Sequence, residues 1–339
     1  MTHATQHRRR RAVRLTAAVP LALGTLLAAT LSSGTASADP WSAATAQLGQ
    51  GQQAQRPVEE YVALGDSWTA DVVILDRHGG PDTTHAPAGC AQSHVNYPKL
   101  VQRAVRAAIF RDASCGAATT DDFSQPQTGL PLGDTNPPQF DRLTPTTDLV
   151  TVGIGGNDAG IAAAGLDCLN LLPVDNPISQ TGPGLPLGGC RAKYVRDGVD
   201  QLSVRIQQSE AKLVDAFRAI RRISPHARIL AVDYMDVVPA HACYPRVPAT
   251  ETDISYIHAK FVELNAMVRR AAERGGAELV DTYAVTGGHD LCQGPFERYA
   301  EVFGPSVNGV AVGVPAHPNS AGARAQADAV LGHLATHRG

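Results

Sequence analysis

Four short apolar runs constrain the fold of this chain more than any other feature. Each is nearly unbroken in hydrophobic or β-branched residues and does not alternate with polar ones. They are residues 61–64, 148–153, 228–233 and 277–281. Strands buried on both faces of a parallel sheet have this pattern, so we expect four such strands.

Helical patterns separate these runs. Apolar residues form one stripe from Val195 to Ile220. A second helix is expected from Ile254 to Arg274, with its apolar stripe at Ile257, Phe261, Leu264 and Val268. An Ala-rich stretch follows Pro318, a residue that suits the first position of a helix. Strands that alternate with helices predict an α/β fold, in which helices cover both faces of a central parallel sheet as an α/β/α sandwich. Neither a repeat nor a second domain is visible.

The N-terminus has the three-part layout of a secretory signal peptide. Arg8–Arg11 precede an apolar stretch over 15–31, and Ala36-Ser37-Ala38 matches a cleavage site. We therefore predict a signal peptide over 1–38, a flexible Gln/Ala-rich leader over 39–57, and a single domain over 58–339 in a secreted protein. A membrane anchor is the alternative, but the apolar stretch is short for a span of about 20 residues. No later segment is apolar enough to span a bilayer.

The charge balance indicates which classes of partner this chain can bind. Without residues 1–38 the chain keeps 24 of its 29 basic residues and all 32 acidic ones, a formal net charge of −8. Nucleic-acid binding depends on neutralising phosphates, so an acidic chain is a poor candidate for it. Nothing in the sequence implies an oligomer, and we expect a monomer.

Six cysteines follow the predicted cleavage site, and an even number outside the cytoplasm indicates disulfides. Six cysteines allow 15 pairings. Sequential pairing is the simplest and would join Cys90–Cys115, Cys168–Cys190 and Cys243–Cys292. A zinc site is the alternative, with His241 near Cys243 and His289 near Cys292. The spacing fits no common zinc motif, and we predict no metal.

Three short polar segments stand where α/β proteins place their sites. Two directly follow predicted strands and the third opens the last helix. They are Gly65-Asp66-Ser67, Gly155-Gly156-Asn157-Asp158 and His317-Pro318-Asn319. A serine at such a helix start can act as a nucleophile, because free N–H groups there stabilise an oxyanion. An asparagine can donate to the same charge, and a histidine can serve as general base.

Each segment also has a plainer interpretation. Asp66 or Ser67 can cap a helix, and Gly-Asn-Asp is good turn chemistry. Of the other histidines, six carry no recognisable motif and are interpreted as ordinary surface residues: His78, His85, His94, His226, His258 and His333.

Together with Gly116, within residues 114–120, these blocks and their order resemble the GDSL, or SGNH, hydrolase family over about residues 59–335. The resemblance implies a flavodoxin-like fold with a parallel sheet of about five strands. It implies Ser67 as nucleophile and His317 as base. The oxyanion donors would be the backbone N–H groups of Ser67 and Gly116 and the side chain of Asn157. Asp66 and Asp158 would hold loops in place. The family requires no metal or organic cofactor.

Six cysteines and an exported chain look like the secreted actinobacterial lipases, esterases and phospholipases of that family, which carry three sequential disulfides. One position departs from the pattern, because many members have an aspartate three residues before the histidine, where this chain has Val314. We therefore predict a Ser67–His317 dyad, with the main-chain carbonyl of Val314 accepting from the imidazole ring.

The predicted function is hydrolysis of carboxylic esters, most simply of lipids, through an acyl-enzyme. A carbohydrate acetyl esterase is an alternative on the same scaffold, and a non-catalytic binding protein is another. The α/β-hydrolase fold fits less well, since its G-x-S-x-G elbow would need a glycine where Thr69 stands.

Overall fold

The computed structural model describes residues 57–170, 189–302, 306 and 312–337. The predicted signal peptide, and all of the predicted leader except Pro57, lie outside the described residues. Residues 55–339 form one compact unit. In the described part of the chain, no helix combines the length and the apolar character that crossing a bilayer requires.

The four predicted strands are present, and a fifth joins them in one parallel sheet. The strands follow the order β3-β1-β4-β7-β8 across the sheet. Their bounds are β1 (Glu60–Gly65), β3 (Ile109–Asp112), β4 (Leu149–Gly153), β7 (Arg228–Val232) and β8 (Glu278–Val280). The sequence pattern missed β3 because most of its side chains are not buried: Ile109 is 45% exposed, and only Asp112 is fully buried.

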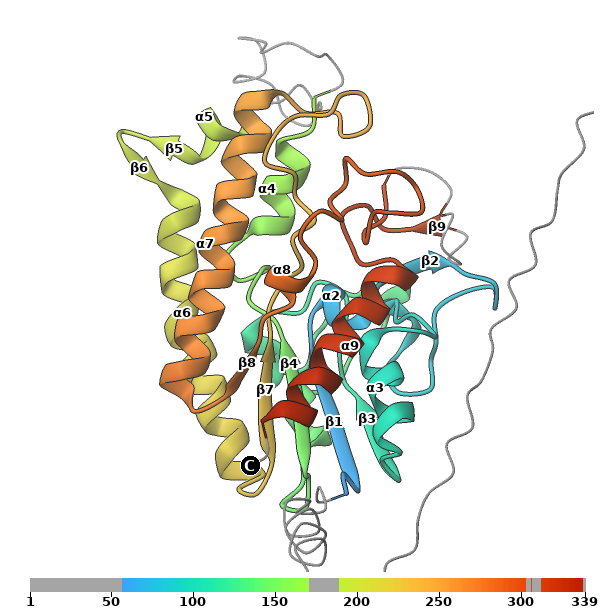
Figure 1. Ribbon diagram of the computed structural model, residues 1–339. Coiled ribbons are helices and arrows are strands. Elements are labelled where there is room, and N and C mark those ends of the chain that lie inside the picture. The colour runs from blue at the N-terminus through green and yellow to red at the C-terminus, as the bar shows by residue number, and fades with distance from the viewer. Residues whose placement is uncertain (1–56, 171–188, 303–305, 307–311, 338–339) are drawn as a thin grey trace, which may run out of the picture. The chain divides into compact units, whose positions relative to one another are not determined.

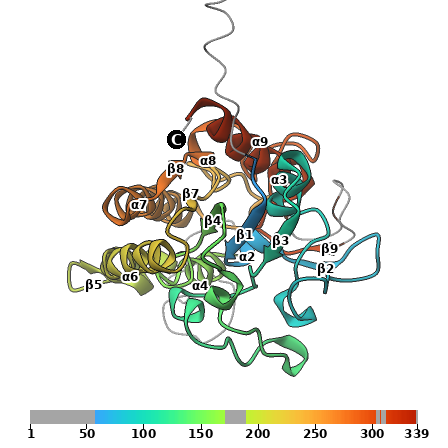
Figure 2. The same cartoon turned by 90° about the horizontal axis from the view of Figure 1, so that it is seen from below.

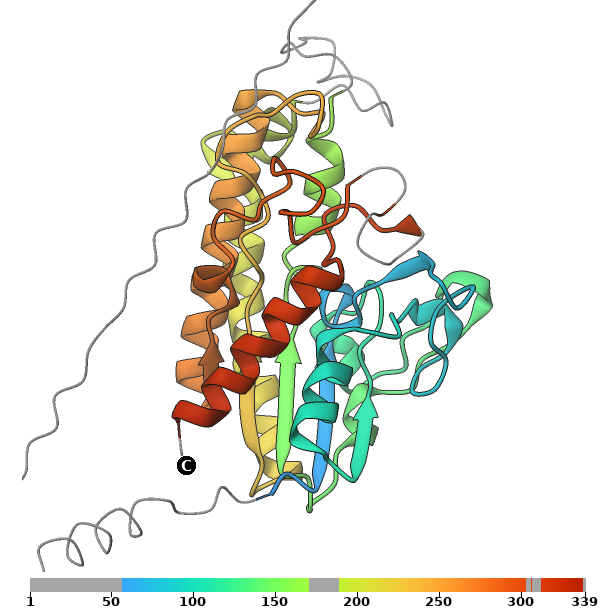
Figure 3. The same cartoon turned by 45° about the vertical axis from the view of Figure 1, so that its right-hand side comes forward.

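Helices cover both faces of this sheet, as Figures 1 and 2 show. On one face lie α3 (Tyr97–Val105) and α9 (Ser320–Thr336), which Figure 3 shows in front of the strands. On the other lie α6 (Gln201–Ile223) and α7 (Glu251–Gly275). Tyr61 and Ala63 of β1 pack into the first layer, whereas Val62 and Leu64 pack into the second. The predicted α/β/α sandwich with five parallel strands is thus confirmed.

The smaller elements lie mainly at the carboxyl ends of the strands and along the loops. The short helices are α2 (Ser67–Ala70), α4 (Ile161–Asp167), α5 (Cys190–Tyr194) and α8 (Thr282–Val285). Two antiparallel ribbons pair β2 (Val73–Leu75) with β9 (Val312–Gly313), and β5 (Val195–Arg196) with β6 (Val199–Asp200). Single 3-10 turns cover 88–90, 120–123, 131–133 and 139–142.

Three predicted helix starts were wrong. Helix α7 begins at Glu251, three residues before the predicted Ile254, because the Thr250 side chain caps it by accepting from the N–H of Asp253. The stripe that begins at Val195 becomes helical only at Gln201, because the Asp200 carboxylate caps α6 by accepting from the N–H groups of Leu202 and Ser203. In α9 the cap is Asn319, so Pro318 lies before the helix and not at its first position.

All six cysteines form disulfides in the predicted sequential pairs Cys90–Cys115, Cys168–Cys190 and Cys243–Cys292. This excludes the alternative zinc site, because a disulfide sulfur has no thiolate to offer a metal.

Candidate active site

The sequence folds so that Ser67 stands at the carboxyl edge of the sheet. Strand β1 ends at Gly65, Asp66 caps α2 by accepting from the N–H of Trp68 at 2.9 Å, and Ser67 is the first residue of α2. Gly65 is required by close packing, because a Cβ there would lie 2.2 Å from Thr69 Oγ1 and 2.6 Å from the Gly153 carbonyl oxygen. The turn therefore presses the start of α2 against the end of β4.

His317 reaches Ser67 from the far end of the chain. Its main chain pairs with Glu301, whose N–H donates to the His317 carbonyl at 2.9 Å and whose carbonyl accepts from the N–H of Ala316 at 2.9 Å. The imidazole Nε2 then lies 2.8 Å from Ser67 Oγ, across 250 residues of sequence. The two residues predicted as nucleophile and base are brought into direct contact.

The hydrogen bond of the other ring nitrogen goes to a carbonyl other than the predicted one. His317 Nδ1 lies 3.0 Å from the carbonyl oxygen of Pro315, where a ring N–H can donate to it. The Val314 carbonyl accepts from the backbone N–H of His317 at 3.2 Å, and it also favours the charged form of the ring. Ala316 adopts a φ of +61°, which bends the chain back toward the ring. The carbonyl that is hydrogen-bonded to Nδ1 therefore belongs to the residue after the predicted Val314.

The protonation of His317 suits a general base. Burial against apolar groups lowers the pKa of this imidazole to about 4, although the carbonyls of Pro315 and Val314 favour its charged form. The ring is therefore neutral near pH 7, with Nε2 free to accept the proton of Ser67.

Of the predicted oxyanion donors, Asn157 keeps a free N–H and Gly116 does not. One hydrogen of the Asn157 amide donates to the Ala118 carbonyl at 2.9 Å, which fixes the side chain and leaves its second hydrogen available. The Gly116 N–H donates to the Cys90 carbonyl at 3.0 Å, so it is already used, and its predicted role is corrected.

The neighbouring Ala117 is a residue that sequence reasoning missed. It adopts a φ of +62°, and its N–H has no acceptor among the described residues. Cys115 binds the Gly65 carbonyl at 3.1 Å, and Ala118 binds Asn157, so Ala117 is held between the ends of β1 and β4. The positive φ and the free N–H of Ala117, which distinguish it from Gly116, are visible only in the structure.

Asp66 and Asp158 hold loops, as predicted. The Tyr234 hydroxyl donates to Asp66 at 2.5 Å and accepts from the Gly156 N–H at 2.7 Å, which ties the Ser67 segment to the Asn157 segment. Burial raises the pKa of Asp66 to about 7, against the hydrogen bonds from Tyr234 and Trp68.

Asp158 joins the Asn157 segment to the third loop. Its carboxylate accepts from the Thr120 N–H at 3.0 Å and from the Thr120 hydroxyl at 2.6 Å. The loops that follow β1, β3 and β4 are thus connected through side chains as well as through the sheet.

A cavity of about 270 Å³ opens beside Ser67 and His317. Its walls are almost wholly apolar and come from α2, α4, α7 and the loop after β7. Prominent lining residues are Trp68, Ile161, Leu166, Val238, Ile257, Phe261 and Leu291. Ile257 and Phe261 belong to the stripe of α7 that predicted a core-facing helix, so periodicity could not reveal that part of this stripe lines a cavity.

Known proteins resemble this chain in sequence and in fold. Residues 63–325 match the model of the GDSL-like lipase/acylhydrolase family. The chain is 34% identical over 278 residues to "Lipase 2" of Streptomyces coelicolor, covering 80% of this chain and 84% of that protein. It is 29% identical to an "Esterase" of Streptomyces scabiei, over 94% of this chain and 93% of that one.

Among solved structures, the extracellular lipase of Streptomyces rimosus superimposes with a TM-score of 0.60 at 23% identity, over 80% of this chain and 98% of that one. Phospholipase A1 of Streptomyces albidoflavus gives a TM-score of 0.59 at 22% identity, over 81% and 99% of the two chains. At these identities the structures establish the common fold.

The α/β/α fold and these relatives define a carboxylic ester hydrolase. The chain belongs to the GDSL-like lipase/acylhydrolase family, which is also the resemblance that its four sequence blocks indicate.

Proposed function

We propose that this protein is a secreted serine esterase that hydrolyses lipid esters through a Ser67–His317 dyad and an acyl-enzyme. The observation that carries the proposal is the 2.8 Å contact between Ser67 Oγ and His317 Nε2 at an apolar cavity of about 270 Å³.

Acylation begins when His317 Nε2 takes the proton of Ser67 as Oγ attacks the ester carbonyl carbon. The Pro315 carbonyl, 3.0 Å from Nδ1, holds the ring in the tautomer that leaves Nε2 unprotonated beforehand. A carbonyl lacks a full negative charge, so it stabilises the resulting imidazolium less than a carboxylate would. The imidazolium then protonates the departing alcohol, which leaves the acyl group on Oγ.

The negative charge on the former carbonyl oxygen needs donors held in place beforehand. We assign this role to the backbone N–H of Ser67, the free amide hydrogen of Asn157 and the N–H of Ala117 in place of Gly116. Asn157 is fixed by Ala118 and needs no reorientation.

Deacylation repeats the sequence with water. His317 removes a proton from water, the hydroxide attacks the acyl carbon, and the carboxylic acid leaves as Ser67 regains its proton. Every group in this scheme comes from one chain, so a monomer suffices, and no step requires a metal or organic cofactor.

The apolar cavity favours lipid substrates, because an alkyl chain gains free energy when it leaves water for such walls. Relatives named lipase and a structural neighbour named phospholipase A1 are consistent with this substrate class. Secretion is supported by three disulfides, by the signal-peptide layout of residues 1–38, and by a structural neighbour described as extracellular.

The test is hydrolysis of esters graded from acetyl to palmitoyl, with phosphatidylcholine and an acetylated sugar included. Ser67→Ala serves as the control for each substrate. We expect Ser67-dependent turnover that is highest on long acyl chains or phospholipid. A maximum on the acetylated sugar would replace lipids with carbohydrates as the substrate. Turnover that persists undiminished in Ser67→Ala would contradict the mechanism.

A further inference from the structure

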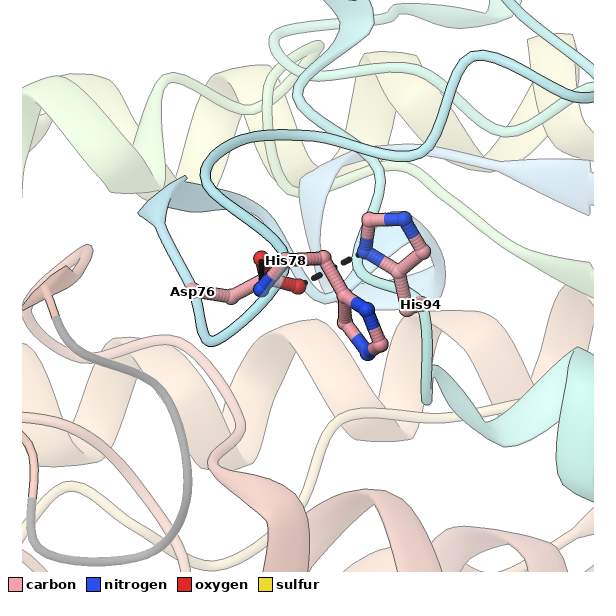
Figure 4. Close-up of side chains that lie close together, drawn as sticks. All are labelled: Asp76, His78 and His94. Carbon is pink, nitrogen blue, oxygen red and sulfur yellow. Dashed lines mark hydrogen bonds and ion pairs between the residues drawn. The ribbon is translucent and has the colours of Figure 1, made fainter.

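The loop after β2 brings three metal-ligating side chains together outside the active-site cavity. Asp76, His78 and His94 each offer one ligand atom, and these atoms all lie within 4.8 Å of one another. Figure 4 shows the Asp76 carboxylate and the two imidazole rings gathered at one place, with His78 and His94 coming from different stretches of the loop. None of the three lines the cavity beside Ser67.

Main-chain hydrogen bonds hold these stretches in place independently of the three side chains. The Val73 N–H donates to the Ala91 carbonyl at 2.9 Å, and the Ser93 N–H donates to the Ala70 carbonyl at 3.0 Å. The segment that leads to His94 therefore runs beside the segment that leads to Asp76. The nearby Cys90–Cys115 disulfide anchors the same segment.

The ligand side chains are also positioned. One oxygen of Asp76 accepts from the backbone N–H of His78 at 2.7 Å, and the other lies 2.7 Å from His94 Nδ1. The Asp76 side chain is only 6% exposed, whereas that of His94 is 29% exposed. The rings of His78 and His94 have centroids 4.3 Å apart. A carboxylate sits at the bottom of the cluster and two imidazoles lie nearer the solvent.

We propose that Asp76, His78 and His94 bind one Zn²⁺ ion, with water in the fourth position. Two imidazole nitrogens and one carboxylate oxygen are ligands that zinc accepts in tetrahedral sites. Magnesium and calcium prefer all-oxygen sites, so this set of donors selects against them. Binding displaces the Asp76–His94 hydrogen bond, and the ring proton of the ligating nitrogen is released or moves to the other ring nitrogen. His78 Nε2 accepts from Arg77 Nε at 3.2 Å, so His78 binds the ion through Nδ1 or gives up that hydrogen bond.

The place of the cluster in the fold gives the ion a structural role. Strand β2 follows α2, which begins with Ser67, and it pairs with β9 through Val73–Gly313 and Leu75–Val312. Strand β9 in turn leads into the segment that carries His317. A zinc ion at the end of β2 therefore stabilises the ribbon that connects the two segments, without contact to either reacting side chain.

The experiment is a zinc titration of the full chain without an affinity tag, after dialysis against a chelator. Zinc is followed by competition with a chromophoric chelator. We expect one ion per chain and at least a tenfold loss of affinity in each of His78→Ala and His94→Ala. His226→Ala is the matched control, since His226 is an exposed histidine remote from this loop in sequence. Magnesium and calcium at equal concentration should not compete.

A second measurement is the thermal unfolding midpoint with and without zinc. At a hundredfold excess over the dissociation constant, the wild-type midpoint should rise by about 5 °C, and the rise should vanish in His94→Ala. Retained ester hydrolysis by both variants shows that they fold. Equal affinity in wild type, His78→Ala and His94→Ala would overturn the proposal. So would zinc binding that survives in His94→Ala and is lost in His317→Ala, which would locate the ion at the dyad instead.

Discussion

The Tyr234 hydroxyl donates a 2.5 Å hydrogen bond to the Asp66 carboxylate, beneath the turn that presents Ser67. The same hydroxyl accepts from the N–H of Gly156, the residue before Asn157. One buried side chain after β7 therefore fixes the spacing between the proposed nucleophile and a proposed oxyanion donor.

Tyr234→Phe removes both hydrogen bonds and leaves the buried N–H of Gly156 without a partner. We expect a loss of about 1–3 kcal/mol in the free energy of unfolding, together with a fall in kcat that exceeds any change in KM. Urea unfolding and steady-state kinetics measure the two effects. Tyr194→Phe is the matched control, because Tyr194 also donates to a carboxylate, that of Asp167 at 2.6 Å, and neither residue lines the cavity. Equal kcat values in both variants would show that Tyr234 does not position the reacting groups.

Asn157→Ala deletes a proposed oxyanion donor without touching the dyad. Loss of one such donor costs about 10²- to 10³-fold in kcat, with KM little changed. The comparison variant is Asn136→Ala, which removes another buried amide that donates to a carbonyl, that of Ala113. A kcat for Asn157→Ala no lower than that for Asn136→Ala would remove Asn157 from the mechanism.

Val314→Ala should retain most activity, because the groups that face the His317 ring are main-chain carbonyls. We expect kcat within about threefold of wild type, against a loss of about 10⁴-fold or more in His317→Ala. KM is measured as well, since the Val314 side chain lines the cavity. A loss in Val314→Ala as large as that in His317→Ala would mean that the valine side chain itself is needed.

The pH profile of kcat/KM should follow the low pKa of His317. Burial lowers this pKa to about 4, so the base is neutral above it and activity falls as the pH drops through about 4. The fold favours the neutral ring, so its contribution to stability is full above pH 6.5 and is lost as pH falls toward 4. A soluble short-chain ester assayed from pH 3 to pH 9 measures the profile.

Asp66 provides the internal check on that profile, since burial raises its pKa to about 7. An inflection near pH 7 that Asp66→Asn removes belongs to this carboxyl and leaves the assignment of His317 intact. An inflection near 6.5 that persists in Asp66→Asn would show that the imidazole titrates as it does in water.

Local patterns in the sequence correctly predicted much of the fold. Unbroken apolar runs predicted β1, β4 and β7, because a strand buried on both faces has no polar side. The run over 277–281 also predicted β8, which is an edge strand. The strand β3 was not predicted, because Ile109 and its neighbours are partly exposed and form no unbroken apolar run. The start of α6 was misplaced because an apolar stripe continues through Val195 and Val199, whereas the cap at Asp200 decides where the helix begins.

The sequence by itself determined which residues could react, because the Gly-Asp-Ser, Gly-Gly-Asn-Asp and His-Pro-Asn blocks are local and keep their order. Only the tertiary structure decided what each group contacts. It placed Ser67 beside His317, hydrogen-bonded the Nδ1 of the ring to the Pro315 carbonyl, and committed the Gly116 N–H to Cys90. It also brought His94 to Asp76. Hydrogen-bond partners depend on which distant segments of the chain come into contact. The periodicity of apolar residues predicts which side chains are buried, but it does not predict those contacts.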